Sequence, residues 1–185
     1  MKSLKQFIKE SQEINESLVG DVVRKLLDTG LSWIEGSVKW IANKSADAVG
    51  EVWKTHRDVL TTTYSDFRRT HPEYKFLAET VKTPKEYAIN NIAIFFEDDV
   101  KTEHKIDYAN DLIAKFKKNE SAPGAAKNLI VDVVRQCYCG ITQNPKATAS
   151  DKAKADKFLK NVKSSVDDDT AKLIDSNIKH YISEM

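Results

Sequence analysis

Two cysteines and four histidines are the residues of this 185-residue chain best suited to bind a metal or to act as nucleophiles. Cys137 and Cys139 form a C-x-C pair, and no second pair exists with which they could build a four-cysteine zinc site. On a helix, side chains two residues apart point about 200° apart around the axis, so a disulfide between them is geometrically poor. Cys137 also belongs to a helix-periodic apolar series, which comprises Leu129, Ile130, Val133, Val134, Cys137 and Ile141. We therefore predict a small buried thiol and a reducing compartment.

The four histidines are isolated from one another in the sequence, at His56, His71, His104 and His180. Glu103 lies beside His104, and Cys137 could meet a distant histidine, but any helical protein offers such pairs by coincidence. The chain contains neither a G-x-x-x-x-G-K-[ST] nor a G-x-G-x-x-G phosphate loop, and it also lacks H-E-x-x-H and G-x-S-x-G motifs. We predict that the protein is not an enzyme, with no catalytic, cofactor-binding or metal-binding residue.

The charge of the chain indicates no particular partner. Lys and Arg total 29 against 28 for Asp and Glu, so no net field attracts nucleic acid or an anionic membrane. Arg68 and Arg69 with Tyr64 and Tyr74 could meet a phosphate backbone, but without a basic excess we interpret them as a solvated helix end. No run of eighteen apolar residues is present to span a membrane. We expect no specific nucleic-acid binding and no membrane contact.

The composition predicts an all-α protein. Six Gly and four Pro are few for a loop-rich or all-β chain, whereas Lys, Ala, Asp and Glu are plentiful. The periodic segments predict an irregular helical bundle of about eight helices that includes an N-terminal amphipathic helix. We divide the chain into an amphipathic N-terminal arm, residues 1–17, and a single helical domain, residues 18–185.

The stretch from Leu18 to Phe67 carries all three tryptophans and long apolar stripes at helical spacing. In its second half the stripe comprises Val49, Val52, Trp53, Val59, Leu60, Tyr64 and Phe67. Upstream, Trp33 and Trp40 lie seven residues apart and widen a second stripe. This apolar surface must be covered, either as a buried core helix or as a surface helix that docks onto a partner. A membrane-surface helix is a third interpretation, although its polar face mixes acids with bases.

Local signals predict where several later helices begin. The run Thr83-Pro84-Lys85-Glu86 is a capping box with proline at the first helical position. Because the segment from Ile89 to Phe96 also favours β-structure, a short strand is the alternative there. Ser150-Asp151 is expected to begin another helix. The acidic run 167–169 lacks the alternating spacing of a calcium loop, so we predict that it caps the last helix.

Proline and runs of charged residues predict where other helices end. His71-Pro72 breaks the first long helix, and we expect a short helix after it with Phe76, Leu77 and Val81 facing inward. The acidic run 97–99 is interpreted as a solvated end or a cap. The next helix, with Ile106, Ala109, Leu112, Ile113 and Phe116 on its apolar face, should end at the basic run 115–118, which suits its negative dipole end.

The first sixteen residues form an amphipathic pattern, with Leu4, Phe7, Ile8 and Ile14 on one side. An isolated helix of this length is marginal in water and needs the protein body or a partner. MKSLKQFIKE resembles the N-terminal pattern M-K-[ST]-x-x-x-F-I-x-E of virion and head-internal proteins of large tailed bacteriophages. That resemblance implies a capsid-targeting leader, which a prohead protease removes after [LI]-x-E before a small residue. Ile14-Asn15-Glu16 followed by Ser17 matches this site, as does Ile8-Lys9-Glu10 followed by Ser11.

Together these observations lead us to expect a non-enzymatic structural or accessory protein of a tailed-phage virion, made in the host cytoplasm. It would dock on neighbouring subunits as a homo-oligomer or a ring or shell component. The partner-binding residues would be Leu4, Phe7, Ile8, Ile14, Trp33 and Trp40. One alternative is a head-internal cargo protein, targeted into the prohead and cleaved between Glu16 and Ser17. A second alternative is a soluble helical regulator.

Overall fold

The structure, a computed structural model, describes residues 53–118 and 123–183, and within these ranges it contains helices and turns but no strand. The helices are residues 53–70, α4 (Pro84–Phe96), α5 (Thr102–Lys118), α6 (Pro123–Thr142), α7 (Ala149–Lys163) and α8 (Asp168–Ser183). The all-α prediction is therefore confirmed for the described part of the chain. The predicted total of eight helices and the boundary between arm and domain concern residues outside these ranges and stay predictions.

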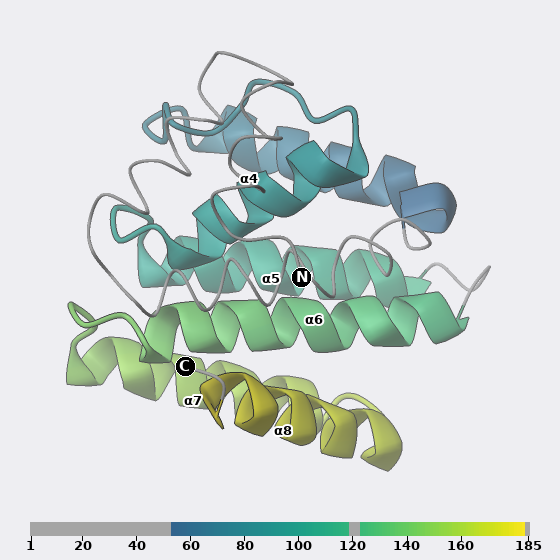
Figure 1. The fold of residues 1–185 in the computed structure, drawn as a ribbon, viewed down its shortest axis with the longest axis vertical. Helices are drawn as coiled ribbons and strands as arrows, with labels where there is room; N and C mark the ends of the chain where they lie inside the picture. The colour runs from purple at the N-terminus through teal and green to yellow at the C-terminus, as the bar shows by residue number, and fades with distance from the viewer. Residues whose placement is uncertain (1–52, 119–122, 184–185) are drawn as a thin grey trace.

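Helix α6 is the centre of the arrangement (Figure 1). It contacts α4 and α5 on one side and α7 and α8 on the other. Its sequence is apolar almost all the way round between residues 129 and 141, which is the pattern of a helix covered on every side. Even Arg135 is fully buried, where its guanidinium pairs with Asp132 at 3.1 Å and lies 5.4 Å from the ring centroid of Tyr181 in α8.

The helix of residues 53–70 packs beside α4 and α5 through the apolar stripe seen in the sequence. Trp53, Tyr64 and Phe67 are buried, and the Trp53 ring lies 5.9 Å from that of Tyr87 in α4. The Tyr64 hydroxyl is 2.6 Å from the Ala78 carbonyl oxygen and 3.0 Å from Asn90 Oδ1, so its polar end is satisfied inside the core. For this helix the core interpretation is confirmed.

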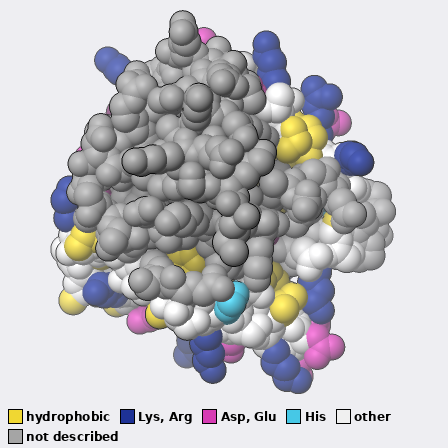
Figure 2. All heavy atoms as spheres, viewed as in Figure 1, with side chains coloured by type: hydrophobic (Ala, Val, Ile, Leu, Met, Phe, Trp, Pro, Cys, Tyr) yellow, Lys and Arg dark blue, Asp and Glu magenta, His cyan; other side chains and the backbone are white. Residues whose placement is uncertain are grey.

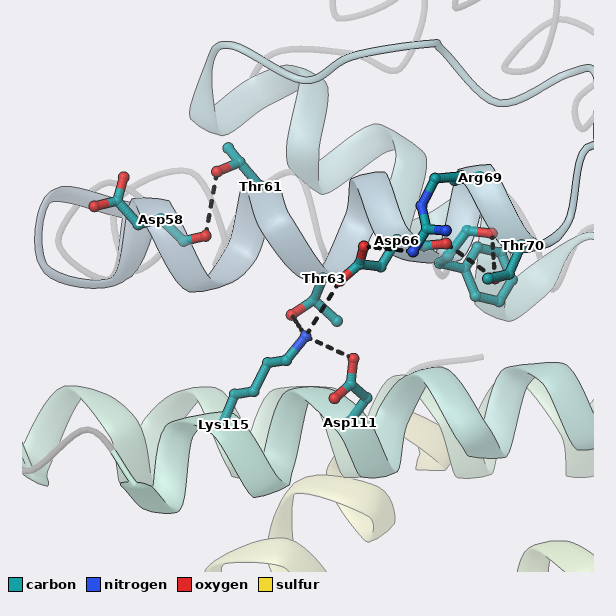
Figure 3. A network of polar contacts seen from close by, with 9 residues as sticks. Asp58, Thr61, Thr63, Asp66, Arg69, Thr70, Asp111 and Lys115 are labelled. Carbon is teal, nitrogen blue, oxygen red and sulfur yellow. Dashed lines mark hydrogen bonds and ion pairs between the residues drawn. The ribbon is translucent and has the colours of Figure 1, made fainter.

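A polar contact also joins this helix to α5 (Figure 3). Lys115 Nζ donates to Asp111 Oδ2 at 2.8 Å within α5 and to Thr63 Oγ1 at 3.1 Å across the interface. Asp66 Oδ2 lies 3.9 Å from the same nitrogen. Because the groups are half exposed, the ion pairs of Lys115 contribute little free energy.

The predicted helix starts are found where the sequence indicates them. Thr83 caps α4 in a capping box with Glu86, and Thr148 caps α7 in the same way with Asp151. Asp167 caps α8, because its carboxylate accepts hydrogen bonds from the Thr170 N–H at 2.8 Å and from its hydroxyl at 2.6 Å. These bonds lower the pKa of Asp167 to about 2.

One expectation about the middle of the chain is wrong, and the helix expected over residues 89–96 is confirmed against its alternative, a strand. Residues 71–83 form turns rather than a short helix, with bonds such as Leu77 N–H to the Tyr74 carbonyl oxygen, 3.1 Å, that close single turns after Pro72. Leu77 and Val81 are nevertheless buried, as predicted. The alternative strand is also absent, because residues 89–96 belong to α4. Residues 89–96 are all buried, so this part of α4 has no exposed face. Without alternating exposed and buried positions at helical spacing, its sequence resembles that of a buried strand.

Candidate functional site

The residues that the sequence predicts to bind partners, and the predicted processing site, lie outside the described residues. They are Leu4, Phe7, Ile8, Ile14, Trp33 and Trp40, with Glu16 and Ser17 at the cleavage point. Within the described part, two groups of polar side chains are brought together by the fold. One joins the turn after residue 70 to the first turn of α5, and the other lines a pocket beside α5 and α7.

The first group is a histidine cluster, defined here as His71, Glu73, Tyr74 and His104. The His71 N–H closes the preceding helix on the Phe67 carbonyl oxygen at 2.9 Å, and Pro72 then turns the chain. The turn brings the buried Tyr74 ring back over Phe67, nearly parallel to it at 6.1 Å. This packing places three members of the cluster opposite the start of α5, from which His104 projects.

The cluster has a defined geometry. The two imidazole rings lie 4.0 Å apart between centroids and are tilted by 31°. Glu73 Oε1 is 3.4 Å from His71 Nδ1 and 4.0 Å from His104 Nδ1. The Tyr74 oxygen accepts a hydrogen bond from the Lys101 N–H at 3.2 Å, so the hydroxyl can donate its proton to His104 Nδ1 at 2.8 Å. A neutral His104 then carries its own proton on Nε2.

The protonation states follow from these surroundings. Burial lowers the pKa of His104, with smaller contributions from the charges of His71 and Lys101. The pKa of Glu73 is also lowered, first by a hydrogen bond from its own backbone and then by the two histidines. Burial raises the pKa of Tyr74, which keeps the phenol protonated. At neutral pH His104 is therefore a neutral imidazole, whose Nδ1 lone pair accepts the Tyr74 proton, and Glu73 is a carboxylate whose Oε1 lies 4.0 Å from the same nitrogen.

The fold thus brings together His71 and His104, which are isolated from each other in the sequence. Glu103 does not form a pair with its neighbour His104, because its carboxylate binds Lys154 of α7, and that contact lowers the pKa of Glu103. The sequence places only one histidine of the cluster close to Glu73. The run His71-Pro72-Glu73 is a local H-x-E, whereas the second histidine is thirty residues or more away and no periodicity connects it.

The second group lines a pocket of about 230 Å³ at the N-terminal ends of α5 and α7. Lys105 borders it and is only 2% exposed, and this burial lowers its pKa to about 8. The acidic side chains of Asp98, Glu97 and Asp151 raise the pKa of Lys105 in part, but burial has the larger effect. Asp98 Oδ2 binds Lys146 Nζ at 2.6 Å across the pocket, while Asp98 Oδ1 is buried and has no hydrogen bond among the described residues.

The sequence predicts that the acidic run 97–99 is a solvated end or the cap of the next helix. Its first residue instead caps the end of α4, and only the third is exposed. Glu97 is 7% exposed and Asp98 is 15% exposed at its side chain, whereas Asp99 is exposed. Glu97 ends α4, where its N–H donates to the Ala93 carbonyl oxygen at 3.0 Å. Its burial follows from the packing of α4 on α6, which the local sequence does not show.

The cysteines carry no reactive chemistry. Both are buried and free, as predicted for Cys137. Burial raises the pKa of Cys139 to about 12 and that of Cys137 well above its ordinary range, so both remain neutral thiols.

The basic residues after Tyr64 do not form a phosphate-binding surface. Arg69 pairs with Asp66 at 3.1 Å, and Arg68 Nε donates to the Leu77 carbonyl oxygen at 3.3 Å. Tyr64 and Tyr74 are buried and cannot stack on bases. Figure 2 shows Lys and Arg side chains of the described residues at several places around the edge of the face it views. The interpretation as a solvated helix end fits the exposed Arg69, whereas Arg68 is half-buried against the turn that follows.

Comparisons with known proteins identify no relative of this chain. No family model matches it, and neither a curated protein nor a solved structure shows significant similarity. Among the described helices, none is both long enough and apolar enough to cross a membrane.

Proposed function

We propose that this chain is a non-enzymatic structural or accessory protein of a tailed-phage virion, which docks on neighbouring subunits through the amphipathic residues that precede its helical body. The proposal rests on the resemblance of MKSLKQFIKE to phage virion leaders and on the apolar residues Leu4, Phe7, Ile8 and Ile14. Trp33 and Trp40 extend the same apolar character along the chain.

The surface of the described residues is the observation that favours docking by the earlier segment. Among those residues, Ile182 is the one exposed large hydrophobic side chain, at 42%. A stable protein interface needs a core of apolar or aromatic anchors, and a single isoleucine does not provide one. If the protein assembles with other subunits through apolar contacts, the anchors must therefore come from residues outside the described ranges.

The test is the fate of the native protein in purified phage particles. We expect the intact chain in the particle at a fixed copy number, as measured by intact-mass spectrometry and quantitative peptide analysis. The double variant Leu4→Asp/Phe7→Asp should be lost from particles, because charges on the apolar face prevent docking. The matched control Lys5→Gln/Gln6→Ala changes the opposite, polar side and should be incorporated normally.

Other outcomes separate the alternatives. A mature N-terminus at Ser17 in particles would establish the head-internal cargo protein and reject the uncleaved component. Absence of the chain from particles, combined with a monomeric protein in the cell extract, would instead favour a soluble helical regulator. Normal incorporation of the Leu4→Asp/Phe7→Asp variant would contradict docking through the leader.

A further inference from the structure

We propose that His71, Glu73 and His104 form a binding site for one divalent transition-metal ion of the zinc type. One ligand atom of each residue lies within 4.8 Å of those of the other two. The site does not depend on the proposed virion function, because it is built entirely within the helical body.

The ligand types favour this class of ion. Two imidazole nitrogens and one carboxylate oxygen suit Zn²⁺, Co²⁺ or Ni²⁺, whereas Mg²⁺ and Ca²⁺ prefer sites made of oxygen alone. Three protein ligands of this kind leave a fourth position open for water or another small molecule. Such a set differs from the closed four-ligand sites that hold purely structural zinc.

The distances in the cluster are longer than those of strong hydrogen bonds and are close to the separations of ligands around one ion. Glu73 Oε1 lies 3.4 Å from His71 Nδ1 and 4.0 Å from His104 Nδ1, which exceeds the roughly 2.7–2.9 Å of a charge-assisted hydrogen bond. Ligands about 2.0–2.2 Å from a tetrahedral zinc ion are roughly 3.3–3.6 Å from one another. Small rotations of the half-exposed Glu73 side chain, which is 51% exposed, would complete that geometry.

The ligands are held by packing and, in the metal-free protein, by a hydrogen bond to His104. The His71 ring lies 4.6 Å from Phe67, and the two imidazoles support each other at 4.0 Å. The buried Tyr74 hydroxyl is fixed by the Lys101 N–H and orients His104. This hydrogen bond is made to His104 Nδ1 itself, so it orients the ring only in the metal-free protein. An ion bound at Nδ1 would displace it, and the Tyr74 hydroxyl would turn its proton away while its oxygen continues to accept from the Lys101 N–H.

Binding would connect parts of the chain that are distant in sequence. His71 and Glu73 follow the helix of residues 53–70, and His104 belongs to the first turn of α5. An unfolded chain does not hold these three groups together, so an ion that binds the folded state raises its stability. The site would thus fasten the first described helix to α5.

The experiment uses the full chain, stripped of metal with a chelator and titrated with Zn²⁺ near neutral pH by isothermal calorimetry. We expect one ion per chain for the wild-type protein. His71→Asn, His104→Asn and Glu73→Gln should each weaken the affinity about tenfold to a hundredfold or more. His180→Asn removes an exposed histidine of α8 and is the matched control, which should bind as the wild type does. Circular dichroism of each variant establishes that it is folded, and the half-exposed Glu73→Gln keeps the test valid if a histidine variant unfolds.

A second measurement locates the ion. Four histidines give separate imidazole proton signals by NMR, and Zn²⁺ should shift those of His71 and His104 while His56 and His180 stay unchanged. Co²⁺ should give the visible absorption of a nitrogen- and oxygen-ligated ion, and this absorption should be lost in the His104→Asn variant. The proposal is overturned if the wild type does not bind, if the folded variants bind as tightly as it does, or if Zn²⁺ shifts the signal of another histidine instead.

Discussion

Gly140 permits a close approach between α6 and α4, and its replacement by alanine should destabilise the protein. The glycine lies in α6 opposite the end of α4. A methyl group built on it would lie 2.2 Å from the Phe95 carbonyl oxygen and 2.8 Å from the Phe95 carbonyl carbon. Real Cβ atoms essentially never come within 3.0 Å of another atom, and here the obstacle is backbone that cannot rotate away. The two helices must therefore separate by close to an ångström.

The magnitude follows from two opposing effects. Overpacking a close-packed core costs about 1–3 kcal/mol, and a clash with backbone belongs at the upper end of that range or above it. Alanine returns about 1 kcal/mol, because it has a higher helix propensity than glycine. The residues of α4 around the contact are fully buried, so separation also opens the core. We expect Gly140→Ala to lower the free energy of unfolding by about 2–3 kcal/mol.

Gly124 is a matched control in the same helix. Nothing lies within 4 Å of a methyl group built on it, and it is exposed. Gly124→Ala should therefore show the propensity effect without the clash and stabilise the protein by about 0.4–1 kcal/mol. Urea denaturation followed by far-ultraviolet circular dichroism measures both variants, and thermal scans should show a midpoint lowered by roughly 5–10 °C for Gly140→Ala.

If Gly140→Ala is as stable as the wild type, or gains as much as Gly124→Ala does, α4 and α6 do not approach as closely as the structure shows. A loss similar to that of Gly140→Ala in the Gly124→Ala variant would show that the effect does not arise from helix contact. Equal slopes in the urea transitions of wild type and variants are needed to compare the free energies directly.

Three further predictions concern burial and capping. Lys105→Met should raise the free energy of unfolding by about 1–3 kcal/mol in urea titrations, because it removes a buried ammonium group. The control Lys157→Met replaces an exposed lysine and should change the free energy of unfolding by under about 0.5 kcal/mol. If Lys105→Met has no larger effect than Lys157→Met, or lowers the stability, the buried position of Lys105 is contradicted. Thr83→Ala should lower the thermal stability by about 1 kcal/mol through loss of the α4 cap, and Thr83→Ser should restore most of it. Cys137 and Cys139 should react with a disulfide reagent at mildly alkaline pH only as fast as the protein unfolds, because burial raises the pKa of both thiols. Rapid reaction of the native protein would refute the burial of the two thiols.

The features that the sequence predicted correctly all depend on a few neighbouring residues. The capping box at Thr83 marks the start of α4, and Asp167 marks that of α8, because each hydrogen bond joins residues three apart. The apolar face of α5 and the burial of Cys137 follow from helical periodicity within one segment. Their physical basis is local, so one sequence suffices to show them.

Other features depend on which helices lie next to one another. The meeting of His71 and His104, the burial of Lys105 and Glu97, and the need for glycine at Gly140 each require contacts between distant segments. Helical spacing places Lys105 on the same face of α5 as Ala109 and Leu112, but a lysine on such a face can extend its ammonium group into water. Only the packing of the neighbouring helices shows that the whole side chain is covered. The sequence by itself determined the helices and their apolar faces, and only the tertiary structure decided which polar groups share a site, because packing brings together residues that no local pattern connects.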